Sequence, residues 1–365
     1  MGFESGSVSF RMFYVPGGLP TDCVRRFAKH AAPPIQKLGR EAINGWVSGR
    51  HLLDREIDED NAFVGGYLRL TLMKAERKIP DALLRAECRI QELAELRAEG
   101  GASLKRERRV EIRKEIIERL MPNMPPMLTG IPMVYDGQSE TLYAGATGEK
   151  QTDVLVQAVK EAVDKAPVPV TAASAAMRRK KVNVRDLDPT SFSPELENEL
   201  ASDSLGQDFL TWLWFHSEAG GGLVDTDRGQ FAVAIQGPLA FVLEGEGAHE
   251  TLLRKGSPLV SSEAKTALLS GKKLISARLI VARGDEQWEG IFDAERFAFR
   301  SLKVPKGQPL DPISRFQERM VLLETFREGF FAFFDRFLAD RADAAKWKPV
   351  QKSIHQWVAG RTTKR

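Results

Sequence analysis

The sequence has few of the residues that most often build metal or redox sites. Its 365 residues include 2 cysteines and 5 histidines, and Cys23 and Cys88 form no metal-binding or redox spacing. No apolar run approaches the roughly 18 residues that a membrane span needs, and no apolar segment follows a basic start at the N-terminus. We therefore expect a soluble cytoplasmic protein with no metal, no cofactor and no membrane contact.

The chain also has little net charge. Its 53 Lys and Arg residues against 50 Asp and Glu residues give a formal charge of +3. Such a balance creates no overall field toward a polyanion, so any binding of nucleic acid must come from local clusters. With 42% hydrophobic and 28% charged residues, the composition is that of a globular protein long enough for two or three domains.

Apolar periodicities predict an α+β fold, with mixed or antiparallel sheets, flanking helices and a protruding helical pair. We expect strands at 7–15, 43–47, 67–73, 131–135, 141–144, 230–236, 239–244, 273–283, 287–292 and 297–302. We expect helices at 20–38, 81–98, 103–120, 149–164, 209–215, 261–270 and 313–340. Asp136-Gly137 and Gly237-Pro238 are predicted to be turns between paired strands.

Composition divides the chain into four regions. Residues 1–78 together with 129–170 are predicted to form a central α+β domain, and residues 79–128 a helical tip. Residues 171–207 are rich in Ala, Ser and Pro and are interpreted as a linker or insertion. Residues 208–365 are predicted to form a base domain that ends in a Phe-rich helix and a basic tail.

Basic side chains are segregated on one face of the predicted helix 103–120. At about 100° per residue they share an arc of about 100°, and they are Lys105, Arg106, Arg109 and Arg113. Like charges four residues apart disfavour a helix by roughly a few tenths of a kcal/mol per pair. A segregated stripe therefore favours an anionic ligand such as DNA phosphates. The alternative is a solvated helix with Arg108/Glu111 and Glu111/Lys114 ion pairs.

Three further basic clusters occur in the chain. They are Arg178, Arg179, Lys180 and Lys181; then Arg254 and Lys255 with Lys272 and Lys273; and the acid-free C-terminal residues from Lys346 to Arg365. A solvated surface is the alternative for each cluster. Trp347 and Trp357 in the last cluster either stack on bases or pack on the preceding helix. Four clusters in a nearly neutral chain favour polyanion binding.

The acidic residues form no recognised catalytic pattern. The run Asp54–Asp60 lacks the spaced ligands and glycine of a calcium loop, and a surface loop is the favoured interpretation. Gly220-Gly221-Gly222 is not followed by Lys-Ser or Lys-Thr, so it is not a phosphate loop. No set of carboxylates stands out as a nuclease centre for divalent ions. We expect a protein that is not an enzyme.

The predicted helix 313–340 is apolar on more than one face. A helix that is apolar most of the way round must be buried on several sides. Core packing is one explanation, and a subunit interface that includes Phe330 and Phe334 is another.

The ordered series of motifs resembles the family of the recombination-associated protein RdgC. In the first half the series comprises Gly45-Trp46-Val47, Leu68–Met73, Lys74–Pro80, the charged helical pair, Leu120-Met121-Pro122, Met133–Ala144 and Pro167–Val170. In the second half it comprises Phe209–Phe215, Ser262–Lys272 and the Phe-rich helix. The likeness covers most of the chain and rests on the order of these motifs.

This resemblance implies a non-catalytic, nucleoid-associated protein that encircles duplex DNA as a ring-shaped homodimer. Such proteins bind DNA with little sequence preference, also bind single-stranded DNA, and limit RecA-dependent strand exchange. The family's basic helix corresponds to residues 103–119, so Lys105, Arg106, Arg109 and Arg113 are expected to line the hole. The loop at Arg254-Lys255 is expected to lie near it.

One segment departs from the family pattern. Members usually have a Phe shortly after the Leu-Pro, and it fills a pocket across the dimer. Residues 123–128 of this chain contain no Phe, and Met124, Met127 and Leu128 are the candidates for that contact. Two other functions stay open: a divalent-metal-dependent DNA exonuclease, and an interaction scaffold that uses the Phe-rich helix.

Overall fold

One antiparallel sheet joins the two halves of the chain, and among the described residues it has 13 strands. Ten of them lie in the order β10-β9-β11-β12-β13-β1-β6-β5-β4-β2, while β3 pairs with β4, β7 with β1 and β8 with β9. The computed structural model describes residues 2–100, 103–194, 204–243, 250–254, 262–308 and 310–360. The N-terminal half supplies β1 (Val8–Tyr14), β2 (Ile43–Ser48), β3 (Phe63–Val64), β4 (Tyr67–Arg77), β5 (Pro126–Asp136), β6 (Thr141–Ala144) and β7 (Val168–Pro169). The C-terminal half supplies β8 (Leu223–Thr226), β9 (Gly229–Val242), β10 (Glu250–Leu253), β11 (Lys273–Arg283), β12 (Glu286–Asp293) and β13 (Ala298–Lys303).

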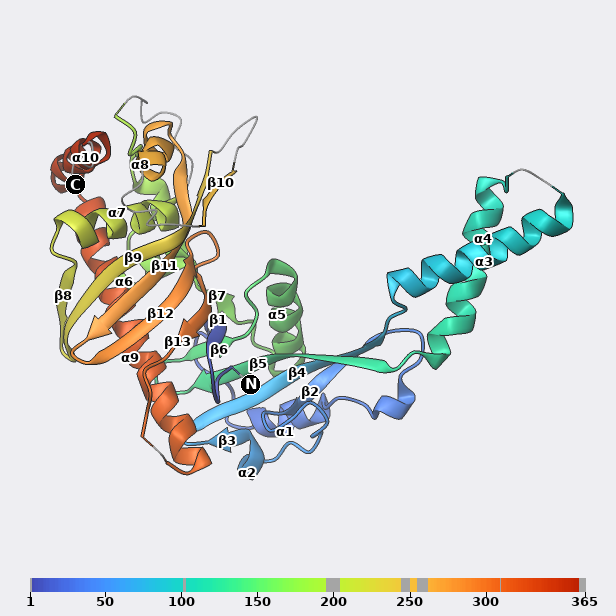
Figure 1. Cartoon of the computed structure of the whole chain (residues 1–365). Helices are drawn as coiled ribbons and strands as arrows, with labels where there is room; N and C mark the ends of the chain where they lie inside the picture. The colour runs from blue at the N-terminus through green and yellow to red at the C-terminus, as the bar shows by residue number, and fades with distance from the viewer. Residues whose placement is uncertain are drawn as a thin grey trace.

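The helices cover the sheet and extend beyond it (Figure 1). In chain order they are α1 (Cys23–Lys29), α2 (Glu59–Ala62), α3 (Asp81–Glu99), α4 (Arg106–Leu120), α5 (Glu149–Val163), α6 (Ala172–Lys180), α7 (Leu205–Ala219), α8 (Ser262–Leu269), α9 (Pro312–Arg341) and α10 (Ala344–Ala359). Three short 3-10 turns are η1 (Ile35–Lys37), η2 (Met121–Asn123) and η3 (Val184–Asp186). The body and the projecting pair α3–α4 together give the chain the outline of a crescent, with α5 on its concave side.

Strand β1 lies between the two halves and is buried on both faces. It pairs with β13 on one side and with β6 on the other. Phe10 and Met12 on one face join the larger apolar core with α7 and α9, whereas Phe13 on the opposite face joins the core under α1 and α5. Because successive strand residues point to opposite faces, one apolar strand can serve both cores.

The arm, defined as α3 and α4, continues directly from two strands of the sheet. β4 and β5 pair from Leu68↔Tyr135 to Arg77↔Pro126, and the helices follow at the far end of this ribbon. The arm has its own small core, formed by Ile79, Leu84, Leu104, Ile112 and Ile116. A long ribbon and a separate core place the arm away from the body.

Most predicted elements are confirmed, including the α+β class and the two helices of the arm. Four predictions about local structure differ from what the structure shows. The helix predicted at 20–38 is only α1 and the separate 3-10 turn η1. β9 runs unbroken through Gly237-Pro238, where a turn was predicted. The predicted linker begins with α6, whose Ala172, Ala175 and Ala176 are buried. The predicted basic tail is largely helix α10, whose Trp347 and Ile354 are buried. The division into independent domains stays a prediction.

Phe330 and Phe334 require a further correction. Both were candidates for a dimer interface, yet they are 1% and 0% exposed within this single chain. The Phe330 ring lies 4.9 Å from that of Phe299 and 5.0 Å from that of Phe292, and the Phe334 ring lies 5.0 Å from that of Phe209. The alternative explanation of the Phe-rich helix, core packing, is therefore the one that applies to these two residues.

Truncation of Phe330 should destabilise the protomer. We expect Phe330→Ala to lower the free energy of unfolding by about 3–5 kcal/mol, because it removes a fully buried ring and leaves a cavity. Val321→Ala is the matched control, since Val321 lies on the same helix and is 42% exposed. Urea titration measures both changes. A variant with unchanged unfolding but weaker self-association would contradict this assignment.

Candidate nucleic-acid interface

The basic stripe of α4 is exposed in the structure. Arg106, Arg109 and Arg113 lie on the helix, and Lys105 is its N-cap residue. All four side chains are exposed, and none forms an ion pair with a residue that the structure describes. α4 packs against α3 through the buried Ile112 and Ile116, which lie beside the stripe on the helix, and the four basic side chains stay exposed next to that contact. The packing of the arm therefore leaves the stripe free to contact a ligand.

Several acidic residues near the stripe are engaged elsewhere, whereas Glu107 in the first turn of α4 is exposed and forms no ion pair with a described residue. Arg108 donates hydrogen bonds to Glu95 of α3 at 2.7 and 2.9 Å, to Glu111 at 2.9 Å and to Glu115 at 3.0 Å. Those carboxylates raise the pKa of Arg108. A further ion pair joins Arg119 to Glu87 at 2.6 Å. The predicted Arg108/Glu111 pair is thus present, and it leaves the stripe itself unneutralised.

The second basic cluster mainly holds α6 in place. Arg179 donates two hydrogen bonds to Asp335 of α9, at 2.7 and 2.8 Å, and lies over the ring of Phe331. Arg178 lies over the ring of Tyr14 at 4.3 Å and 3.6 Å from Glu140. Lys180 is 3.9 Å from Asp335, and Lys181 is exposed. Arg178 and Arg179 therefore help to pack α6, and their role on DNA stays a prediction.

The third cluster divides into exposed and buried members. Arg254 is exposed at the end of β10, whereas Lys255 lies outside the described residues. Lys272 donates to Thr251 at 2.5 Å. Lys273 is 3.3 Å from Asp208, and these side chains are 12% and 5% exposed. The prediction that Lys273 contacts DNA is wrong, because its ammonium group belongs to a buried ion pair.

The tryptophans of the C-terminal cluster pack in the protein. Trp347 is buried and donates to Thr190 at 3.0 Å. Trp357 stands edge-on to Trp214 at 4.9 Å and donates to Glu218 at 2.9 Å. The interpretation that they pack on neighbouring helices is the one the structure supports.

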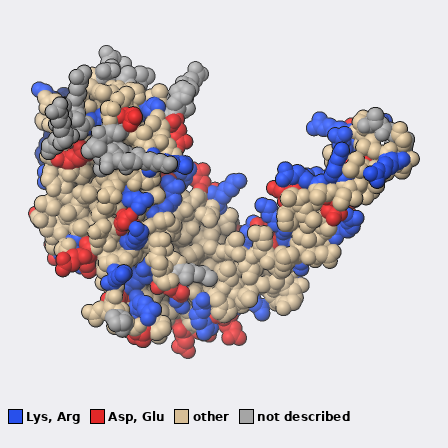
Figure 2. Space-filling model, viewed as in Figure 1, with Lys and Arg blue, Asp and Glu red and all other residues tan. Residues whose placement is uncertain are grey.

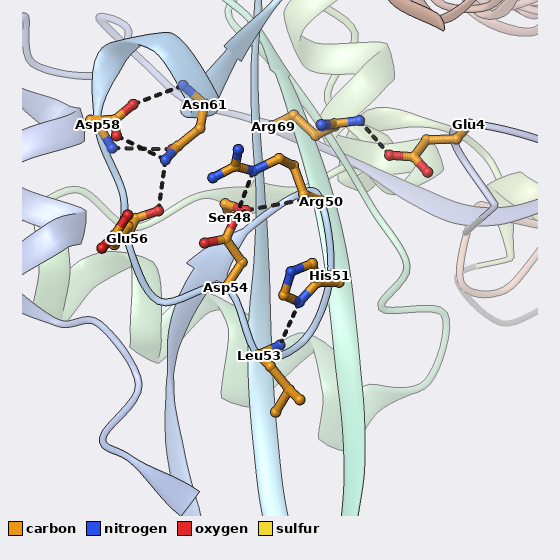
Figure 3. Close-up of polar contacts among 10 residues, drawn as sticks. All are labelled: Glu4, Ser48, Arg50, His51, Leu53, Asp54, Glu56, Asp58, Asn61 and Arg69. Carbon is orange, nitrogen blue, oxygen red and sulfur yellow. Dashed lines mark hydrogen bonds and ion pairs between the residues drawn. The ribbon is translucent and has the colours of Figure 1, made fainter.

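The acidic run 54–60 forms a loop and the start of α2, as predicted (Figure 3). Asp54 accepts hydrogen bonds from Ser48 at 2.5 Å and from Arg50 at 2.6 Å. Asp58 caps α2, with reciprocal bonds to Asn61 at 2.9 and 3.1 Å. These carboxylates serve local structure. Among the described residues, no group of three or more His, Cys, Asp or Glu side chains is arranged to hold a metal ion.

The candidates for arm closure differ in exposure. Met127 is 49% exposed, whereas Met124 packs partly against the arm core and Leu128 against a small core beneath β2. The arm exposes further apolar side chains on α3, namely Leu83, Ile90 and Leu93. On α4 the side chain of Val110 is exposed as well, so both helices of the arm present apolar surface, with three such side chains on α3.

Sequence reasoning missed a group of basic residues around the start of α5. Lys150 of that helix lines a cleft with Arg296 and Arg300 from the region of β12 and β13, and Arg11 of β1 is buried nearby. These residues are far apart in the sequence and form no cluster along it. A charged residue within the apolar strand 7–15 was the one local signal.

Figure 2 shows Lys and Arg side chains along the arm, including the side that faces the body. A single antiparallel sheet that carries a projecting helical arm with an unpaired basic stripe defines the chain as an α+β protein with a candidate polyanion-binding surface. Over the described residues, no helix is long and apolar enough to cross a membrane.

The family model with the description "RdgC: Putative exonuclease, RdgC" matches residues 21–187. We therefore place this segment, which includes the whole arm, in the RdgC family, and the resemblance predicted from the sequence is confirmed over these residues. Membership fits DNA binding associated with recombination. No curated protein matches the chain at a significant level.

Loss of Lys273 should affect stability in a pH-dependent way. Burial raises the pKa of Asp208, and Lys273 and Arg341 oppose that rise. We expect Lys273→Met to cost about 3–5 kcal/mol of unfolding free energy at pH 8, because it leaves a buried carboxylate unpaired. The cost should shrink as pH falls toward 4, since the folded protein then binds the proton more readily than the unfolded chain.

Urea titrations at pH 4, 6 and 8 measure this dependence, with Lys272→Met as the control. A cost that stays constant over this range would show that Asp208 does not become an unpaired charge in the variant.

Proposed function

We propose that this protein binds duplex DNA through its phosphates, with little sequence preference, and that the α4 stripe is the principal contact. The observation that carries the proposal is the stripe itself, because its four cations are exposed while the carboxylates of Glu95, Glu111 and Glu115 are paired with Arg108. Charge neutralisation by Lys and Arg supplies most of the affinity of such complexes. Membership of the RdgC family supports the same function.

We further propose that two copies of the chain close around the DNA as a homodimer. In this form the protein would limit RecA-dependent strand exchange. It would also bind single-stranded DNA, and it would act in the nucleoid of the cytoplasm. The crescent outline of the chain (Figure 1) and the apolar residues exposed on the arm support a closed homodimer. Closure would offset the low net charge, because an encircled DNA cannot leave without opening the ring. The protein is proposed to act without catalysis.

Removal of the stripe charges should weaken binding and its salt dependence. Each lost phosphate contact lowers the slope of log K against log salt by about 0.9. We expect Arg106→Ala/Arg109→Ala/Arg113→Ala to lower the slope by about 2–3, and the corresponding Glu variant to abolish retention of a short duplex. Fluorescence anisotropy at several salt concentrations measures both effects.

A matched control separates the stripe from the overall charge. Lys346, Lys348 and Lys352 are exposed on α10, and their replacement by Glu changes the net charge by the same amount. This control should bind nearly as the unaltered chain does. Equal losses in both triple variants would contradict a specific role for the stripe.

The proposed homodimer has its own test. Ile90→Asp introduces a charge into the exposed apolar surface of α3 and should shift the dimer toward the monomer at micromolar concentration. Val154→Asp is the control, because it introduces the same charge at an exposed position of α5, outside the arm. Light scattering measures the mass, with and without closed circular DNA. An unchanged dimer in the Ile90→Asp variant would remove α3 from the interface.

A DNA exonuclease is the second candidate, and the description of the matching family model favours it. Incubation of end-labelled linear DNA with the protein and Mg²⁺ or Mn²⁺ separates the two functions. Progressive shortening that requires the metal would establish the exonuclease, whereas retention of full-length DNA supports the binding protein.

A further inference from the structure

The N-terminal end of α5 opens into a cleft of about 510 Å³ that no motif of the sequence marks. Lys150 and Glu149 line it from the helix, and Asp293, Arg296 and Arg300 line it from the region of β12 and β13. The cleft thus joins the two halves of the sheet at the side where α5 packs. Its chemistry follows from three features of the described residues.

The first feature is the N-terminal end of the helix. α5 has 15 residues, and its N-cap residue, Gly148, has no side chain that could accept hydrogen bonds from the first turn. The side chain of Gln151 accepts a hydrogen bond from the N–H of Gly148 at 3.4 Å, and no described side chain accepts one from the N–H groups of the first turn itself. The first intrahelical bond runs from the N–H of Thr152 to the carbonyl of Gly148. Free N–H groups and the helix dipole both favour an anion at this position.

The second feature is Arg11, which is 7% exposed. Its guanidinium donates a long bond of 3.5 Å from Nη1 to Thr152 Oγ1, and its Nε has no hydrogen-bond partner. It forms no ion pair with any described residue. Burial and the nearby Arg296 lower its pKa, and the carboxylates of Asp293 and Glu149 partly oppose that change. A buried guanidinium without a direct ion pair costs free energy that an anion would recover.

Arg11 is not itself among the residues that line the cleft, but it neighbours one of them in the sheet. It pairs with Ala298 in the register of β1 and β13, and Ala298 lines the cleft. Its bond to Thr152 directs the guanidinium toward the first turns of α5. Arg11 therefore approaches the same space as the free N–H groups.

The third feature is the charge balance. Arg296 and Arg300 share one carboxylate, Asp293, at 3.2 and 3.6 Å; Arg296 also lies 3.6 Å from Glu295. Lys150 is exposed and has no ion pair within the described chain. The lining holds three basic groups, Lys150, Arg296 and Arg300, and two acidic groups, Glu149 and Asp293. With Arg11 and Glu295 beside the lining the count is four against three, so the surplus is one positive charge.

We propose that this cleft binds a phosphoryl group through Arg11, Lys150, Arg296, Arg300 and the first turn of α5. Several donors from different directions suit a tetrahedral oxyanion better than a planar carboxylate, which two parallel donors satisfy. The phosphoryl group belongs either to the DNA backbone or to a small phosphate. The DNA source rests on the proposed function above, whereas the small-phosphate source does not.

The test compares two double variants of the full chain. Lys150→Ala/Arg300→Ala removes two exposed donors of the cleft. Lys160→Ala/Lys303→Ala is the control, because it makes the same change on the same helix and the same strand outside the cleft. The probes are inorganic phosphate, followed by ³¹P line broadening against chloride of equal ionic strength, and a short DNA duplex, followed by anisotropy.

If the source is a small phosphate, the unaltered chain and the control should broaden the ³¹P signal, and the cleft variant should reduce the affinity about tenfold or more. If the source is DNA, the cleft variant should lower the salt slope by about 1–2 relative to the control. Absence of both effects overturns the proposal. Phosphate broadening that is equal in all three proteins also overturns it, because it shows an adventitious ion only.

Arg11→Met gives an independent readout. Replacement of a buried, unpaired charge by an apolar side chain of similar size is expected to leave the fold intact, and it should remove the phosphate response. A response that persists in this folded variant would exclude Arg11 from the site. The α4 triple variants separate this site from the proposed function. If they bind DNA normally while Lys150→Ala/Arg300→Ala no longer binds inorganic phosphate, the proposed role of the stripe is wrong and the phosphoryl site is supported.

Discussion

The pairing of β1 between β13 and β6 is the constraint on which the rest of the structure depends. This N-terminal strand joins strands that follow it by more than a hundred residues along the chain, and its two faces supply both large cores. Without it, the β13 edge and the β6 edge would each present unpaired backbone groups. The long range of these contacts also means that both halves must be complete before the sheet can close.

Local pairing decides which basic residues are available for a ligand. Arg179 and Lys273 belong to clusters as basic as the α4 stripe, yet Asp335 and Asp208 neutralise them inside the protein. The stripe differs because Arg108 occupies the nearby carboxylates Glu95, Glu111 and Glu115. A basic cluster in a sequence is therefore weak evidence for DNA contact until the positions of its acidic partners are known.

The sequence was most informative where a pattern is local. Periodicity was sufficient for the strands 67–73 and 131–135 and for both helices of the arm, since alternation and helical repeats need no distant partner. It failed at Gly237-Pro238, because both flanking segments pair with β11 and continue as one strand. For Phe330, periodicity left two environments open, the protein core and a subunit interface. Its contacts with Phe209 and Phe292, which are distant in the sequence, place it in the core. The cleft near Arg11 could not be predicted either, because the residues that form it are also distant from one another in the sequence.

The attachment of the arm to β4 and β5 makes its reach adjustable only in steps. Each residue added to both strands of the paired ribbon would carry the helices outward by about 3.4 Å, but it would also turn the arm to the other face of the sheet. Two added residues restore the face and extend the reach by about 6.8 Å. Relatives with longer or shorter ribbons are therefore expected to differ by even numbers of residues in each strand. The distance between the arm and the body would then change in fixed increments rather than continuously.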